Sequence, residues 1–184
     1  MKSKGVIITI VAVIAVVVLV IVGINSVPGT AIGYEEKVTE AYSAIKVQEK
    51  RRADLIPNLV DCVQAYDQHE YETLMDVVKA RTGADGTLSD DVVAEVKEAI
   101  HVVVEAYPAL SSQRNYQELM NELSITENTI AETRNAYNKT VTRYNTYTRH
   151  PIHRFFLNML GYEVKEFEKL SYDVSADAPT NLFQ

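Results

Sequence analysis

The sequence predicts an all-α protein, with a single N-terminal transmembrane helix followed by an antiparallel up-down bundle of about four long helices. Three observations predict this class. The first is a run of 19 uncharged and mostly apolar residues, Val6–Ile24. The second is a series of apolar stripes with three-and-four spacing, which is the repeat of one helix face. The third is the small number of helix breakers, seven glycines and five prolines in 184 residues.

The run Val6–Ile24 has the length of a membrane span. At about 1.5 Å per residue, a helix over it is roughly 28 Å long, close to the hydrocarbon thickness of a bilayer. Lipid favours a helix in spite of the many valines and isoleucines, because every backbone polar group must be bonded within the segment. A cleaved signal peptide is the alternative, but the run is long for one and no Ala-x-Ala site follows. We therefore predict a transmembrane anchor over residues 1–24.

Charges on the two sides of this run predict its orientation. Lys2 and Lys4 precede it, whereas Glu35 and Glu36 follow it. By the positive-inside rule, the N-terminus lies in the cytoplasm and the rest of the chain lies outside it. We expect a single-pass membrane protein with an extracytoplasmic bundle.

After the anchor, residues 25–33 contain Pro28-Gly29 and are predicted to form a hinge. Residues 34–162 are predicted to form the bundle, and residues 163–184 an irregular tail. Short loops between the helices indicate antiparallel neighbours. The four predicted helices cover approximately Tyr34–Lys50, Leu55–Arg81, Ser89 or Asp90 to Pro108, and Ser111 or Ser112 to Thr148.

The segment Arg51–Val60, Arg-Arg-Ala-Asp-Leu-Ile-Pro-Asn-Leu-Val, lies between the first two helices. Arg51 and Arg52 favour a helix C-terminus, where their charge meets the negative end of the macrodipole. Asp54 is a good N-cap, which puts Pro57 in the first turn, where its missing N–H costs nothing. The pattern predicts a helix, a tight corner and a second helix. A single helix kinked at Pro57 is the alternative.

Charge and motifs argue against two classes of function. Removing Lys2 and Lys4 from the 18 basic residues leaves 16 against 25 acidic ones, and nucleic-acid binding needs clustered positive charge. A di-iron bundle needs two Glu-x-x-His motifs, and the sequence has one, Glu98-Ala-Ile-His101. His150 and His153 are close enough to share a metal, but no nearby Cys or Asp completes a set. We expect no nucleic acid, no metal, no cofactor and no enzymatic activity.

Three motifs resemble those of the LemA family of bacterial membrane proteins. The first is Arg51–Val60. The second is Glu127-Asn-Thr-Ile-Ala-Glu-Thr-Arg-Asn-Ala-Tyr-Asn138, followed by Tyr144-Asn145. The third is Pro151 with Leu160-Gly161-Tyr162. The resemblance covers about residues 34–162 and implies an N-terminal helix in the bacterial cytoplasmic (inner) membrane and an extended helical bundle. It implies no particular biochemical activity.

Two positions depart from the pattern of that family. Tyr42 stands where a Trp is usual, and His150 replaces the Phe before Pro151. Both are packing positions, so they leave the expected fold unchanged.

The polar and aromatic residues of the first two motifs are the candidate site. One interpretation is that they fix the corner and the register of the bundle through half-buried polar networks. The other is that they form a binding surface for a protein partner. The first is favoured. The residues are Arg51, Arg52, Asp54, Pro57, Asn58, Glu127, Asn128, Arg134, Tyr137, Asn138, Tyr144 and Asn145.

The apolar segment Pro151–Leu160 is predicted to form a short amphipathic helix with two alternative placements. It either caps the open base of the bundle or lies in the lipid interface through Phe155, Phe156 and Leu160. Arg154 and the two neighbouring histidines suit anionic headgroups, which favours the interface.

These features predict a membrane-anchored, non-enzymatic scaffold or adaptor of the bacterial cell envelope. Its expected partners are the membrane and an envelope protein, and homo-oligomerisation stays open. The alternative is an accessory or sensor subunit of an envelope membrane protease or of another membrane complex. A hydrolase or metalloenzyme is the third hypothesis.

Overall fold

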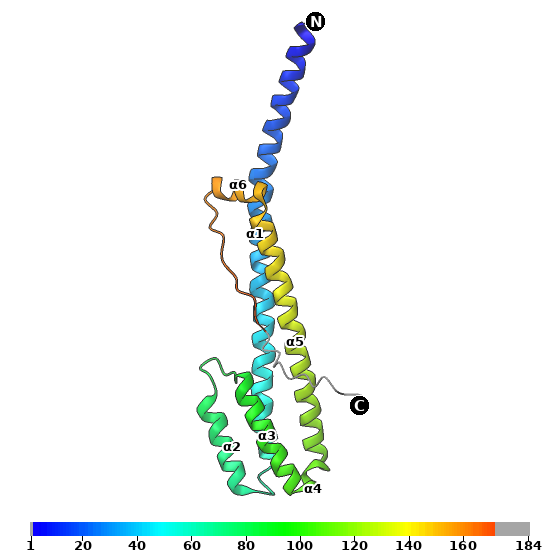
Figure 1. Cartoon of the computed structure of the whole chain (residues 1–184), viewed down its shortest axis with the longest axis vertical. Coiled ribbons are helices and arrows are strands. Elements are labelled where there is room, and N and C mark those ends of the chain that lie inside the picture. The colour runs from blue at the N-terminus through cyan, green and yellow to red at the C-terminus, as the bar shows by residue number, and fades with distance from the viewer. Residues whose placement is uncertain (1, 172–184) are drawn as a thin grey trace, which may run out of the picture. The chain divides into compact units, whose positions relative to one another are not determined.

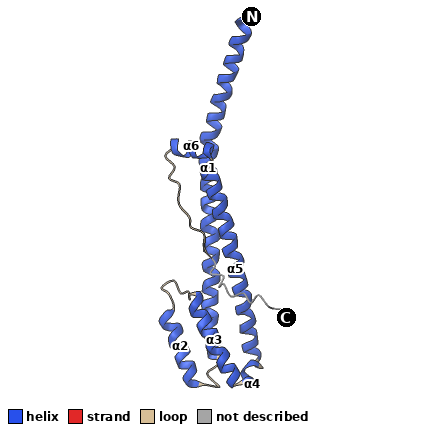
Figure 2. Ribbon diagram, in the orientation of Figure 1, coloured by secondary structure: helices blue, strands red, loops and turns tan. Residues whose placement is uncertain are grey.

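The structure is a computed structural model of the chain that describes residues 2–171, with side chains from residue 7 onward. Helices make up most of this range, and no strand occurs in it (Figure 2). The predicted all-α class is therefore confirmed. The helices are α1 (Lys2–Asp61), α2 (Gln68–Arg81), α3 (Asp90–Ala106), α4 (Pro108–Ser111), α5 (Arg114–Arg149) and α6 (Pro151–Met159) (Figure 1).

The backbone forms two compact units. Unit 1 is Met1–Thr39 with Tyr137–Gln184, and unit 2 is Glu40–Ala136. Because α1 and α5 each contribute to both units, every unit combines segments that are far apart in the sequence.

Unit 2 is a four-helix up-down bundle. It consists of the last turns of α1, all of α2 and α3, and the first turns of α5, and consecutive helices run in opposite directions (Figure 1). Their apolar stripes meet in one core, which is the main source of stability because it removes aliphatic surface from water. Its buried members include Ile56, Leu59, Val60, Val63, Leu74, Val78, Val93, Val96, Ile100 and Leu123.

Side-chain caps begin two of these helices. Ser89 Oγ accepts a hydrogen bond from the Val92 N–H at 3.4 Å at the start of α3, so of the two predicted starts, Ser89 and Asp90, Ser89 is the cap. Asp67 Oδ1 accepts one from the Glu70 N–H at 3.0 Å at the start of α2. Both caps satisfy amide groups that have no partner within the helix.

The predicted corner at Asp54 and Pro57 is wrong. α1 continues without a break to Asp61, and the chain turns only over residues 62–67. Asp54 therefore lies inside a helix, not at an N-cap, and Asp67 is the cap of the next helix. An internal proline costs about 3 kcal/mol or more. The apolar residues on both sides of Pro57, which include Ile56 and Leu59, are fully buried and outweigh it.

The predicted hinge over residues 25–33 is helical as well, because α1 passes through Pro28-Gly29. Val27 and Ala31 are buried on the face of this segment that packs against Leu157. This packing stabilises the helix in spite of its two local breakers. Within it, Thr30 Oγ1 donates a hydrogen bond to the Ser26 carbonyl, one turn earlier, at 2.9 Å.

Unit 1 contains the N-terminal part of α1, the last turns of α5, helix α6 and the segment that follows it. α6 lies across α1 in Figure 1, and its bounds agree closely with the predicted amphipathic helix. Residues 163–171 contain no helix and run back from α6 beside the pair of helices α1 and α5 (Figure 1). The rest of the predicted irregular tail lies outside the described residues.

Candidate functional site

Unit 2 brings the first two sequence motifs together in one ion-pair network, which we call the arginine network (Glu49, Arg52, Asp90 and Arg134). Asp90 is central to it: Oδ1 lies 2.7 Å from Arg52 Nη2, and Oδ2 lies 2.8 Å from Arg134 Nη1. Arg134 also contacts Glu49, with 2.8 Å between Nη2 and Oε1. Four side chains thereby join α1, α3 and α5.

The positions of these groups follow from the helices that carry them. Arg52 lies on the inward face of α1, and 6% of its side chain is exposed. Its Nη2 also donates to the Leu88 carbonyl at 3.0 Å, whereas its buried Nε has no hydrogen-bond partner within the described residues. Asp90 occupies the first turn of α3, where the helix dipole favours a carboxylate.

The network favours the charged forms of Asp90 and Arg134. The hydrogen bond from Arg134, followed by that from Arg52, lowers the pKa of the Asp90 carboxyl against the opposing effect of burial. The same bond to Asp90 raises the pKa of Arg134. Each charged group of the network has a counter-ion in the network. This arrangement favours the interpretation that Arg52 and Arg134 fix the packing of the bundle.

The remaining motif residues of unit 2 lie outside the network and nearer the surface. Asn58 Nδ2 donates to the Asp54 carbonyl within α1 at 3.0 Å, one turn away across Pro57. Asn128 is exposed. Three further ion pairs involve motif residues: Arg51 with Glu122, Asp54 with Lys50 at 3.3 Å, and Glu127 with Lys97 at 3.0 Å.

Unit 1 uses three other motif residues to bind an extended segment of the same chain, residues 163–171, which we call the C-terminal strap. Asn138 makes two hydrogen bonds with the Leu170 backbone: Nδ2 donates to the carbonyl at 2.8 Å, and Oδ1 accepts from the N–H at 2.9 Å. The Tyr137 hydroxyl donates to the Glu168 carbonyl at 3.1 Å. The fully buried Tyr144 accepts from the Lys165 N–H at 3.0 Å.

These contacts satisfy backbone groups of a strap that has no secondary structure of its own. One side-chain contact adds to them, since the rings of Tyr144 and Phe167 pack edge to face with centroids 5.1 Å apart. The side chains of Tyr137, Asn138 and Tyr144 therefore have a defined role in holding the strap against α5.

Glu35 of α1 is a further contact point for the chain that follows α6. The Tyr162 hydroxyl donates to Glu35 Oε2 at 2.7 Å, and Lys165 forms an ion pair with the same carboxylate. The Lys165 and Tyr162 hydrogen bonds lower the pKa of Glu35, and burial together with the bond to Glu35 raises that of Tyr162.

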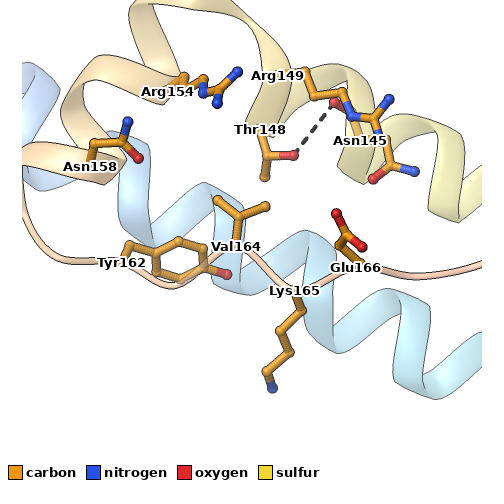
Figure 3. Close-up of a pocket in the computed structure, with 9 residues that line it drawn as sticks. All are labelled: Asn145, Thr148, Arg149, Arg154, Asn158, Tyr162, Val164, Lys165 and Glu166. Carbon is orange, nitrogen blue, oxygen red and sulfur yellow. Dashed lines mark hydrogen bonds between the residues drawn. The ribbon is translucent and has the colours of Figure 1, made fainter.

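A polar hollow of about 520 Å³ lies in unit 1 between α5, α6 and the strap (Figure 3). Arg149 and Arg154 line it, together with the carboxamides of Asn145 and Asn158. Neither arginine has an ion-pair partner among the described residues, and Lys165 points away from both in Figure 3. The hollow therefore presents the hydrogen-bond donors of two arginines together with the carboxylate of Glu166.

Within residues 2–171, no three His, Cys, Asp or Glu side chains gather closely enough to hold a metal ion. Sequence reasoning missed Glu49 and Asp90 as members of the arginine network, and Glu35 as the contact of Tyr162. Asp90 had one signal, its place in the first turn of α3 beside the Ser89 cap. No sequence signal pointed to Glu49 or Glu35, because their partners are distant in the sequence.

Comparison with known proteins agrees with this organisation. The model of the LemA family matches residues 41–183. The protein LemA from Metamycoplasma hominis is 23% identical over 159 residues, which covers 77% of this chain and 71% of that protein. The family match includes both motifs of the arginine network and the residues that hold the strap. The chain therefore belongs to the LemA family.

Proposed function

We propose that this protein is a non-enzymatic scaffold or adaptor, anchored in the bacterial cytoplasmic membrane by the start of α1, which binds a protein partner through unit 2. One observation carries the anchor. Every side chain from Ile7 to Val22 is exposed, with exposed fractions of the large aliphatic residues between 39% for Val20 and 69% for Ile8. The helix that contains them is long and apolar enough to cross a membrane.

An exposed apolar surface of this extent is stable only when lipid or protein shields it from water. The largest exposed apolar patch on a soluble monomer is about 300–600 Å², and a bare helix with thirteen exposed large aliphatic residues exceeds it. Lipid supplies the cover without any backbone cost, because a helix satisfies its own hydrogen bonds. Lys2 and Lys4 before this stretch, and Glu35 and Glu36 after it, support an orientation with the N-terminus in the cytoplasm.

The anchor is tested by placing charge in the middle of the apolar stretch. Each arginine at the centre of a membrane helix costs about 2.5–3.5 kcal/mol in insertion. We expect Ile14→Arg with Val17→Arg to move the protein from the membrane fraction to the soluble fraction. The control is Val47→Arg with Val102→Arg, the same change at two exposed valines of unit 2. If both double variants stay in the membrane after alkaline extraction, the anchor is not this segment.

The partner is tested by photo-crosslinking in intact membranes. Val47 is exposed and borders a shallow hollow of about 660 Å³ that includes the motif residues Arg51 and Asp54. We expect a photoreactive residue at Val47 to give one discrete adduct, either with another envelope protein or with a second copy. Val102 on α3 is the matched control, since it is equally apolar and exposed. Equal diffuse labelling from both positions, or none, would count against a scaffold that acts through this surface.

A further inference from the structure

Helix α6 has one apolar face that the rest of the described chain leaves uncovered. Ile152, Phe155 and Met159 follow the spacing of a single helix face, and their exposed fractions are 61%, 63% and 49%. Arg154 and Asn158 lie on the other side of the helix, where they line the polar hollow. A nine-residue helix with this division is strongly amphipathic.

The side of α6 that packs on α1 determines the position of α6 along α1. Leu157 is fully buried against Val27 and Ala31. The ring of Phe156 lies directly on Gly23, where any Cβ would overlap it. Phe156 thus contacts α1 at the end of the apolar stretch. Leu157 contacts α1 one to two turns closer to its C-terminus. α6 is packed at the level where the exposed stretch Ile7–Val22 ends.

We propose that the exposed face of α6 lies in the interfacial region of the same bilayer that α1 crosses, where Ile152, Phe155 and Met159 contact lipid. The proposal rests on the proposed membrane anchor. A bilayer that covers residues 7–22 ends beside Gly23, which is where Phe156 lies. Because α6 lies across α1 (Figure 1), a membrane-spanning α1 places α6 along the membrane surface, as in interfacial amphipathic helices.

Charge supports a lipid surface as the occupant. Arg149 and Arg154 are exposed at the α5–α6 junction, and anionic headgroups attract such basic residues near the membrane surface. The polar side of α6, with Arg154 and Asn158, then faces the headgroups and water, as the polar face of an interfacial helix does. The apolar face of α6 is continuous with the lipid-facing surface of α1, so one bilayer covers both.

The chain contains no tryptophan, which permits a direct test. Phe155→Trp introduces a single tryptophan on the exposed face, where its side chain has room. We expect its emission in the full chain, reconstituted in phosphatidylcholine and phosphatidylglycerol vesicles, to be blue-shifted and to be quenched by lipids brominated near the headgroup end of the acyl chain. Phe167→Trp, on the strap, should not be quenched.

A third variant separates this inference from the proposed anchor. Leu19→Trp lies within the apolar stretch and should be quenched by lipids brominated deep in the acyl chain. If Leu19→Trp is quenched and Phe155→Trp is not, the anchor stands and the α6 inference is overturned. If neither is quenched, both fail. A blue shift of Phe155→Trp that is indifferent to brominated lipid but depends on protein concentration assigns the face to a second copy and also overturns the inference.

Discussion

At the scale of single residues, Asp90 is the connection on which two arginines depend. It contacts Arg52 from α1 and Arg134 from α5, and 6% of the Arg52 side chain is exposed. A guanidinium that is buried in this way loses its hydration, so it requires a carboxylate or several hydrogen bonds in return. Without Asp90, Arg52 retains the Leu88 carbonyl as its acceptor.

We predict that Asp90→Asn destabilises the protein by about 1–3 kcal/mol at neutral pH, the cost of removing the charged partner of a buried group. Because the pKa of Asp90 is lowered in the folded state, its stabilisation is complete above the unfolded pKa of about 3.9 and is lost as the pH falls through the folded value. The difference between wild type and variant should therefore shrink below about pH 4. Urea unfolding at a series of pH values measures it.

Asp91→Asn is the matched control for this prediction. Asp91 is the next residue in the first turn of α3 and is exposed, so its replacement removes the same favourable interaction with the helix dipole but no arginine pair. A loss of stability as large as that of Asp90→Asn would show that the dipole, and not the network, accounts for the effect.

The Asn138 side chain bonds the backbone N–H and carbonyl of Leu170 in the C-terminal strap, as a neighbouring strand would. We predict that Asn138→Ala removes both hydrogen bonds to Leu170 and increases hydrogen exchange at the Leu170 amide. The Lys165 amide, bonded to Tyr144, should change less. Lys139→Ala, at the exposed neighbouring position, is the control. Unchanged exchange at Leu170 in Asn138→Ala would mean that the strap does not depend on this contact.

At the scale of helices, apolar periodicity predicted what local signals did not. The stripe Val92, Val93, Val96, Ile100 and Val103 correctly placed α3, and the segment after Pro151 correctly placed α6. Pro57 and Pro28-Gly29 predict a corner and a hinge, but the packing of their buried neighbours on α1 outweighs the cost of these residues in a helix. The sequence does not predict the arginine network, because the network depends on which sides of α1, α3 and α5 pack together.

The true corner gives a prediction at this scale. Asp67 caps α2, so Asp67→Ala should cost about 0.5–2 kcal/mol. Asp54 lies within α1 and, among the described residues, forms an ion pair only with the exposed Lys50, so Asp54→Ala should cost about 0.3–0.5 kcal/mol. Thermal or urea unfolding compares the two. The opposite order would restore Asp54 as a helix cap and contradict the unbroken α1.

At the scale of the whole molecule, the proposed function depends on which side of the membrane holds unit 2. The two lysines before the apolar stretch and the two glutamates after it argue for an N-terminus in the cytoplasm. The chain has one cysteine, Cys62, which is buried, and burial raises the pKa of its thiol. It is a poor thiolate nucleophile in the folded protein, so an added cysteine on the surface can be labelled selectively.

We predict that, in spheroplasts, a membrane-impermeant maleimide labels Glu132→Cys and leaves Ser3→Cys unmodified until the membrane is permeabilised. Glu132 is an exposed residue of unit 2, and Ser3 lies between Lys2 and Lys4, so neither change alters the charges that set the orientation before the anchor. Both cysteines are placed in a Cys62→Ala background, and that background alone gives the blank. Labelling of Ser3→Cys in sealed spheroplasts, with Glu132→Cys protected, would invert the topology and place the partner of unit 2 in the cytoplasm.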